Sequence, residues 1–251
     1  MLIQIPDLLT REDVAKVRAL IGRAQWTDGR ITAGPQSAMT KNNMQVPETD
    51  PQGTEASRIV LAALHRNPTF ISAALPHHIF TPLFNRYSGG ESFGAHVDNA
   101  IRSDPRTGTR LRTDLSATIF LEDPDKYDGG ELVVADTYGE HRVKLRKGHM
   151  VLYPAHSLHH VVPVTRGARL GCFFWTQSMI RDDAKRALLF DMDRSIRQLS
   201  AETPGGDATV TLTSCYHNLV RMWSEVCTCR RALRHRANGR TSRRRRGAPS
   251  G

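Results

Sequence analysis

Three residues of types that bind metal ions stand out in this 251-residue sequence. His96 and Asp98 form a His-x-Asp pair, and His159 lies farther along the chain. On a β-strand, side chains two positions apart point to the same face, so His96 and Asp98 can reach one metal ion. A histidine from a distant strand would complete a triad of two histidines and one carboxylate. Such a triad suits non-haem Fe(II), because it leaves coordination positions open for a co-substrate and O2.

Arg169 follows His159 by ten residues, within the segment Arg166-Gly167-Ala168-Arg169-Leu170. An arginine that points into an otherwise apolar strand needs an anion, and its planar fork suits a carboxylate. Two interpretations remain open. Arg169 either forms a buried ion pair with an aspartate, or it binds the far end of a dicarboxylate whose near end chelates the metal.

Other residues compete for the ligand role. His160 would point to the opposite face of the strand from His159, so only one of the two faces the interior. His156, in the preceding turn, is either a hydrogen-bond donor near the site or a solvated residue. We interpret the remaining candidates as structural residues. His77 and His78 are expected on the surface, Asp114 and Asp136 in turns or ion pairs, and Trp175 in the core.

Regularly spaced short strands must position these side chains. Between residues 79 and 177, turn sequences such as Ser88-Gly89-Gly90 and Asp128-Gly129-Gly130 separate eight strand-like runs. The runs are Ile79–Tyr87, Glu91–Asp98, Asp114–Glu122, Gly130–Asp136, Glu140–Leu145, Gly148–Tyr153, Leu158–Val164 and Ala168–Thr176. This pattern predicts a sandwich or barrel, and eight strands are typical of a jelly roll, or double-stranded β-helix. The ends of the second and seventh strands can then bring the three candidate ligands to one mouth of the barrel.

Helices are predicted on both sides of this β region. Apolar spacing indicates a helix after Thr10 as N-cap, a second from Thr54 to about Arg66, and a short piece from Ser72 to Leu75. Two more follow, over 182–199 and up to about residue 226. We therefore expect an α+β, mainly β fold in four parts. These are an N-terminal helical and strand support region (1–77), the jelly-roll domain (78–178), a C-terminal helical region (179–226) and a disordered arginine-rich tail (227–251).

Charge and cysteine content limit the function classes. The net charge is +10, but residues 227–251 carry nine arginines and no acid, so the other 226 residues carry 10 − 9 = +1. Nucleic-acid binding through the tail is therefore a weak alternative. Cys227, Cys229 and His235 fall short of a zinc site. Four cysteines clustered late, no long apolar run and no signal-peptide pattern favour a cytoplasmic protein without a membrane span.

The chain resembles the bacterial PKHD-type hydroxylases, which are iron(II)- and 2-oxoglutarate-dependent dioxygenases with a prolyl/lysyl-hydroxylase-type domain. The resemblance covers about residues 1 to 226. It rests on Phe84-Asn85-Arg86-Tyr87, His96-Val97-Asp98, Arg112-Thr113-Asp114-Leu115-Ser116-Ala117-Thr118, Tyr127-Asp128-Gly129-Gly130-Glu131-Leu132, the His159 to Arg169 span and Gln177-Ser178-Met179-Ile180-Arg181-Asp182.

The resemblance implies roles for individual residues. His96, Asp98 and His159 would be the iron ligands, and Arg169 would bind the distal carboxylate of 2-oxoglutarate. Tyr87 would hydrogen-bond the same co-substrate, or else serve only as a wall residue. The implied reaction hydroxylates an unactivated C–H bond and yields succinate and CO2, with L-ascorbate as the reductant for over-oxidised iron.

Several substrates and one further function class fit the same residues. Prolyl or lysyl side chains, a free amino acid and a siderophore-related small molecule are all compatible, and the family's association with iron uptake favours the last. A non-catalytic iron or 2-oxoglutarate sensor on the same barrel is the main alternative to an enzyme, and a homo-oligomer is compatible with either. Two long loops, Asp28–Val46 and the arginine-rich Asn99–Thr113, are candidate lids.

Overall fold

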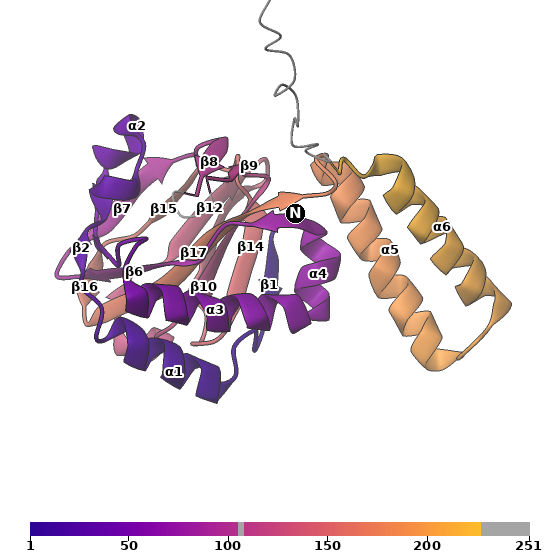
Figure 1. The fold of residues 1–251 in the computed structure, drawn as a ribbon, viewed down its shortest axis with the longest axis horizontal. Helices are drawn as coiled ribbons and strands as arrows, with labels where there is room; N and C mark the ends of the chain where they lie inside the picture. The colour runs from indigo at the N-terminus through magenta and orange to yellow at the C-terminus, as the bar shows by residue number, and fades with distance from the viewer. Residues whose placement is uncertain (105–107, 227–251) are drawn as a thin grey trace, which may run out of the picture.

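Two antiparallel sheets face each other in the computed structural model, which describes residues 1–104 and 108–226 (Figure 1). The larger sheet has the order β1-β14-β10-β17-β6-β4-β2, and β5 also pairs with β17. Its strands are β1 (Ile3–Ile5), β2 (Thr27–Asp28), β4 (Met44–Gln45), β5 (Pro76–Ile79), β6 (Leu83–Ser88), β10 (Leu115–Phe120), β14 (Met150–Pro154) and β17 (Ala168–Ser178). This arrangement confirms the α+β, mainly β class with a jelly-roll core.

The smaller sheet has the order β13-β12-β15-β7-β3. Its strands are β3 (Lys41–Asn42), β7 (Ser92–His96), β12 (Leu132–Asp136), β13 (Gly139–Val143) and β15 (His159–Val161). Two short pairs complete the β structure, β8 (Ile101–Ser103) with β9 (Arg110–Arg112) and β11 (Asp128–Gly129) with β16 (Val164–Arg166). Buried side chains from both sheets, including Phe120, Leu132 and Val161, fill the space between them. The candidate ligands therefore lie in a sheet whose inner face is packed against a second sheet.

Three N-terminal helices cover the outer face of the larger sheet (Figure 1). They are α1 (Arg11–Ile21), α3 (Pro51–Arg66) and α4 (Pro68–Ala74). A capping box starts α1, because Thr10 Oγ1 accepts from the Asp13 amide at 3.0 Å and the Asp13 carboxylate accepts from the Thr10 amide at 3.3 Å. Buried residues such as Val17, Val60 and Leu64 then pack against the sheet. These helices support the β core from the side opposite the smaller sheet.

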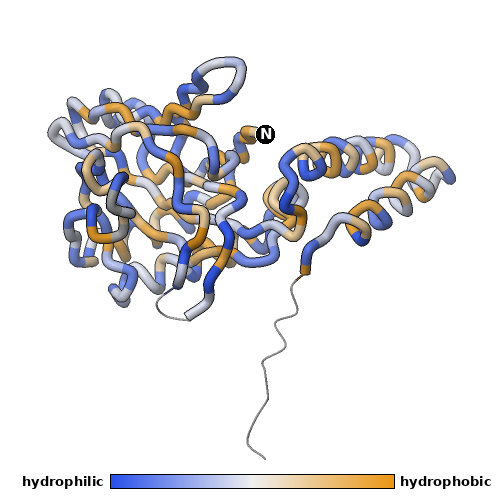
Figure 2. The backbone as a smooth tube through the Cα atoms, turned by 90° about the horizontal axis from the view of Figure 1, so that it is seen from above, coloured by the Kyte–Doolittle hydropathy of each residue, from blue (hydrophilic) through white to orange (hydrophobic). Residues whose placement is uncertain are grey.

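The two C-terminal helices form a hairpin that stands out from the β core (Figures 1 and 2). They are α5 (Asp183–Glu202) and α6 (Asp207–Trp223). Arg186 connects α5 to the preceding segment. It is 1% exposed, forms an ion pair with Asp183 and donates a hydrogen bond to the Ile180 carbonyl at 2.6 Å. No helix in residues 1–104 and 108–226 is both long enough and apolar enough to cross a bilayer.

Several predicted boundaries were wrong, and proline explains most of them. The first run, Ile79–Tyr87, divides into β5 and β6 around Pro82, which has no amide hydrogen for a ladder. The helix expected from Thr54 begins at Pro51, and the piece expected from Ser72 begins at Pro68. In both helices proline occupies the first turn behind an Asp or Asn cap, a position where its missing donor is harmless.

The two predicted loops contain more regular structure than expected. Residues 28–46 include η1 (Gly29–Thr32), α2 (Pro35–Ala38), β3 and β4, while residues 99–113 include the β8–β9 hairpin. The run expected over Leu158–Val164 is β15, and Val164 itself begins β16. The expectations for residues 227–251 lie outside the described residues, and the division of the chain into four parts stays a prediction.

Candidate active site

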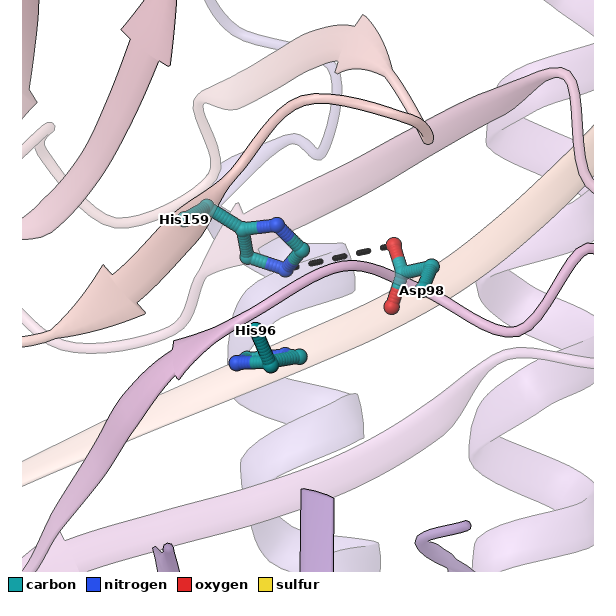
Figure 3. A group of neighbouring side chains, drawn as sticks. All are labelled: His96, Asp98 and His159. Atoms are coloured by element: carbon teal, nitrogen blue, oxygen red, sulfur yellow. Dashed lines mark ion pairs between the residues drawn. The ribbon is translucent and has the colours of Figure 1, made fainter. Parts of the chain in front are cut away.

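The three candidate ligands meet at the inner side of the smaller sheet (Figure 3). Strands β7 and β15 pair antiparallel with His96 opposite His159, and Asp98 follows two residues after β7 ends. One ligand atom from each residue lies within 4.8 Å of the others, and His159 Nε2 is 3.9 Å from Asp98 Oδ2. Convergence of side chains from two distant strands is the geometry that a shared metal ion requires.

Backbone carbonyls orient both imidazoles. His96 Nδ1 is 2.8 Å from the Gly94 carbonyl oxygen, and His159 Nδ1 is 2.9 Å from the Ser157 carbonyl oxygen. A carbonyl can only accept, so Nδ1 carries a hydrogen in each ring, and in the neutral ring the lone pair is on Nε2. Phe93 also stacks on the His96 ring, with centroids 3.6 Å apart and planes 19° apart. These contacts hold each ring in the tautomer and orientation that a metal ligand needs.

Burial keeps His96 neutral. Loss of solvent, and secondly the adjacent His159, lower the pKa of His96 to about 4, so the imidazole carries no proton on Nε2 at pH 7. Asp98 Oδ2 is buried and accepts no hydrogen bond from the described residues. A buried carboxylate oxygen without a donor is unfavourable unless a cation lies beside it. The two imidazoles and this carboxylate therefore form a donor set that fits a divalent metal ion.

Arg169 lies in the same cavity, on the inner face of β17. Its side chain is 2% exposed, and the guanidinium carbon is 5.2 Å from the Tyr87 ring centroid. Tyr87 is the cross-strand partner of Arg169 on β6, and burial raises the pKa of its hydroxyl to about 12, so it stays protonated and can donate. Among residues 1–104 and 108–226, no carboxylate forms an ion pair with Arg169, and its Nε has no hydrogen-bond partner. The geometry thus favours an external anion over a buried Arg–Asp pair.

Gly171 lets two polar side chains approach β17 closely. A Cβ on Gly171 would lie 2.8 Å from Asn85 Oδ1 and 3.2 Å from a terminal nitrogen of Arg169. Asn85 is the cross-strand partner of Gly171, and its Oδ1 is buried without a hydrogen-bond partner. Gly171 itself does not line the cavity, whereas Asn85 and Arg169 do, so the glycine lets these two side chains occupy the space that a Cβ would fill.

The competing polar residues lie outside this cavity. His160 pairs with Val133 and does not line it, and His156 is exposed, 3.5 Å from Asp183. His77 and His78 stack on each other in β5. The two acids form ion pairs, Asp114 with Arg112 at 2.6 Å and Asp136 with His141 at 2.7 Å.

Sequence reasoning missed part of the cavity wall. Trp175, interpreted as core, is 8% exposed yet lines the cavity. Lys41, Asn85, Arg102 and Phe173 line it as well, and none was singled out for a role. The sequence signal for two of these residues was indirect, because Lys41 and Arg102 lie in the two loops that were predicted as candidate lids. Residues 105–107, within the second of these loops, are outside the described part of the chain.

Comparisons with known proteins agree with this geometry. Residues 82–177 match the model of the 2OG-Fe(II) oxygenase superfamily, and residues 183–225 match the PKHD-type hydroxylase C-terminal domain. The chain is 58% identical over 228 residues to a PKHD-type hydroxylase of Xanthomonas euvesicatoria, covering 90% of this chain and 100% of the relative. It is 57% identical over 226 residues to one of Methylobacillus flagellatus, with the same coverage.

Solved structures support the fold. A prolyl hydroxylase from Trichoplax adhaerens, solved with a peptide of the hypoxia inducible factor oxygen degradation domain, matches with a TM-score of 0.53 and 15% identity. That match covers 74% of this chain and 86% of the other. The carbocyclase SnoK from nogalamycin biosynthesis matches with a TM-score of 0.52 and 15% identity, over 71% and 80%. Taken with the sequence relatives, the chain belongs to the PKHD-type hydroxylases of the 2OG-Fe(II) oxygenase superfamily, and it is a 2-oxoglutarate-dependent dioxygenase.

Proposed function

We propose that His96, Asp98 and His159 hold Fe(II), and that Arg169 with Tyr87 binds the distal carboxylate of 2-oxoglutarate. The observation that carries the proposal is one cavity that contains both a three-ligand cluster within 4.8 Å and a buried arginine with no carboxylate partner among the described residues. A dicarboxylate can contact both ends of such a cavity, because one carboxylate suits the guanidinium fork while the 2-oxo acid suits a metal with open positions.

The proposed reaction is R–H + O2 + 2-oxoglutarate → R–OH + succinate + CO2. One oxygen atom of O2 enters the product and the other enters succinate, so atoms and electrons balance. Iron bound at the cluster supplies the activation of O2 that couples decarboxylation to hydroxylation.

The chain's own residues orient and enclose the reactants. The Gly94 and Ser157 carbonyls hold the imidazoles, and the absence of a side chain at Gly171 lets Asn85 and Arg169 pack closely against β17. Apolar walls such as Leu132 and Val161 keep water from the reacting carbon.

We also propose L-ascorbate as the reductant for over-oxidised iron, and a link to iron uptake with a siderophore-related substrate. Prolyl or lysyl side chains and a free amino acid are the alternative substrates. The free thiols of Cys172 and Cys215 suit a reducing compartment, which supports the cytoplasm as the location.

Succinate formation tests the proposal. Protein incubated with Fe(II), 2-oxoglutarate and O2 should form succinate, and His96→Ala, Asp98→Ala or His159→Ala should abolish it while far-UV circular dichroism is unchanged. Full succinate production by any of the three variants would refute the ligand assignment. Metal binding without succinate in the wild type would instead support a sensor. A search for extract metabolites and peptides that gain one oxygen then identifies the substrate.

A further inference from the structure

Asn85 is a buried polar residue of the cavity wall that has no role in the proposed function. Its side chain is 8% exposed and lines the cavity, and its Oδ1 is buried without a hydrogen-bond partner among the described residues. Gln45, its cross-strand partner on β4, directs its own Oε1 to Lys41 Nζ, which donates to it at 3.0 Å. A buried amide oxygen without a donor is unfavourable for the fold unless a ligand changes its surroundings.

The register of β6 on β17 places Asn85 beside the guanidinium of Arg169. Asn85 is opposite Gly171 on the neighbouring strand, and Tyr87 is opposite Arg169. A Cβ on Gly171 would lie 2.8 Å from Asn85 Oδ1 and 3.2 Å from Arg169 Nη1, so both atoms lie close to one point beside the glycine. The amide and the guanidinium are therefore neighbours on the inner face of the larger sheet.

Packing alone does not explain an amide at this position. Gly171 pairs with Asn85 of β6 on one side and with Phe120 of β10 on the other. Phe120 is fully buried, and its ring centroid lies 5.3 Å from the Arg169 guanidinium carbon. An apolar side chain thus packs well against this arginine from β10. The amide on the β6 side indicates a contact with a ligand that has hydrogen-bonding atoms.

A carboxylate bound by Arg169 has room for the Asn85 amide. Its two oxygens offer about four lone-pair positions, and a guanidinium fork occupies two of them. The Tyr87 hydroxyl can occupy a third, because burial raises its pKa to about 12 and keeps it protonated. Asn85 precedes Tyr87 by two residues on β6, so both side chains point to the same face. Asn85 Nδ2 can supply the fourth donor, while Oδ1 accepts from a remaining N–H group of Arg169.

We propose that Asn85 is a further binding residue for 2-oxoglutarate, and that its Nδ2 donates to the distal carboxylate held by Arg169. The proposal deepens the proposed function and rests on it, since it assumes that 2-oxoglutarate occupies this cavity with its distal end at Arg169. Asn85 then contributes to co-substrate specificity. Its amide favours a 2-oxo acid with a distal carboxylate over one with a distal methyl group.

Two 2-oxo acids test this contact. 2-Oxopentanoate has the carbon chain of 2-oxoglutarate, but a methyl group replaces the distal carboxylate. Full-length protein is loaded with Mn(II), and calorimetric titration measures the affinity for 2-oxoglutarate. Competitive titration, in which 2-oxopentanoate displaces 2-oxoglutarate, measures the weaker acid. Asn85→Leu keeps a similar side-chain size without a donor, so 2-oxoglutarate affinity should fall at least tenfold while 2-oxopentanoate affinity stays within twofold.

Asn85→Asp tests the position of the amide beside Arg169. A carboxylate at residue 85 would pair with the guanidinium and repel the co-substrate, so 2-oxoglutarate affinity should fall at least a hundredfold. Unchanged 2-oxoglutarate affinity in this variant would contradict the placement of the distal carboxylate beside residue 85. Asn85→Ala replaces Asn85→Leu if the leucine variant does not fold, with the same selective loss expected.

Thr176→Val is the matched control. Thr176 Oγ1 is also buried without a hydrogen-bond partner among the described residues, but Thr176 does not line the cavity. Its replacement should leave the affinities for both acids unchanged. Unchanged 2-oxoglutarate affinity in Asn85→Leu, or an equal loss for the two acids, would each overturn the proposed contact. Failure of the wild type to bind 2-oxoglutarate would instead refute the proposed function.

Discussion

Replacing Lys41 with methionine should stabilise the metal-free protein at pH 7. Burial lowers the pKa of this lysine from its ordinary value of 10.5 to about 8, so the folded state holds its proton less tightly than the unfolded state does. Each pKa unit corresponds to about 1.4 kcal/mol, so the buried charge costs about 3 kcal/mol at pH 7. Loss of the hydrogen bond to Gln45 costs about 1 kcal/mol and offsets part of this gain.

The pH dependence is the sharper part of this prediction. Between the folded and unfolded pKa values the unfolded state binds more protons, so the free energy of unfolding of the wild type rises with pH. By pH 9.5 the cost of the Lys41 charge falls to about 1.4 kcal/mol, and the advantage of the variant should shrink by about 2 kcal/mol. The charged groups that act on this lysine are Arg102, Asp28 and Asp98.

Urea denaturation with EDTA present, followed by tryptophan fluorescence at pH 7 and pH 9.5, measures both effects. Lys144→Met serves as the control, because it also removes a lysine that stacks on an aromatic ring. A gap between wild type and Lys41→Met that does not change with pH would refute the reasoning. A variant less stable than the wild type at both pH values would show that Lys41 is a structural residue.

Three further perturbations separate co-substrate binding from folding. Gly171→Ala places a Cβ 2.8 Å from Asn85 Oδ1 and 3.2 Å from an Arg169 nitrogen, so the KM for 2-oxoglutarate should rise at least tenfold; an unchanged KM in steady-state kinetics would contradict this. Arg169→Met removes a buried cation that has no carboxylate partner among the described residues. Binding of 2-oxoglutarate should therefore be lost, while the free energy of unfolding stays within about 1 kcal/mol of the wild-type value. A fall of about 3 kcal/mol or more would indicate a structural ion pair. Asp183→Ala leaves Arg186 buried without its ion-pair partner, so it should lower the free energy of unfolding by about 3 kcal/mol. Succinate formation should be retained at temperatures where the variant is folded. An unchanged unfolding midpoint would show that this ion pair does not anchor α5.

Local periodicity predicted the part of the site that lies along single strands. Alternation places His159 and His160 on opposite faces of β15, and only His159 lines the cavity. Asp98 lies two residues beyond the end of β7, so strand alternation with His96 does not account for its position. The pairing of β7 with β15 is a contact between distant segments, and only the jelly-roll pattern and the family resemblance pointed to it. Glycine-rich turns marked the strand ends well, because several of these glycines have positive φ angles that other residue types rarely adopt.

The part of the cavity wall formed by Lys41 and Arg102 could not be predicted in this way. Lys41 lies on a strand of two residues, which is too short to show a period, and only its pairing with Phe93 brings it to the cavity. Arg102 belongs to a series of arginines that resembles a solvated face, and its partners Glu48 and Trp175 are remote in sequence. The predicted starts of α3 and α4 came too late, because Pro51 and Pro68 occupy the first turn of each helix.

Anaerobic titration with Fe(II) tests the central claim most directly. The wild type should bind one Fe(II) per chain at pH 7, with affinity that increases when 2-oxoglutarate is present. Asp98→Ala removes the only carboxylate among the three clustered ligands, so it should bind iron at least a hundredfold more weakly while its circular dichroism spectrum is unchanged. Wild-type stoichiometry and affinity in Asp98→Ala would contradict the assignment of His96, Asp98 and His159 as the iron site.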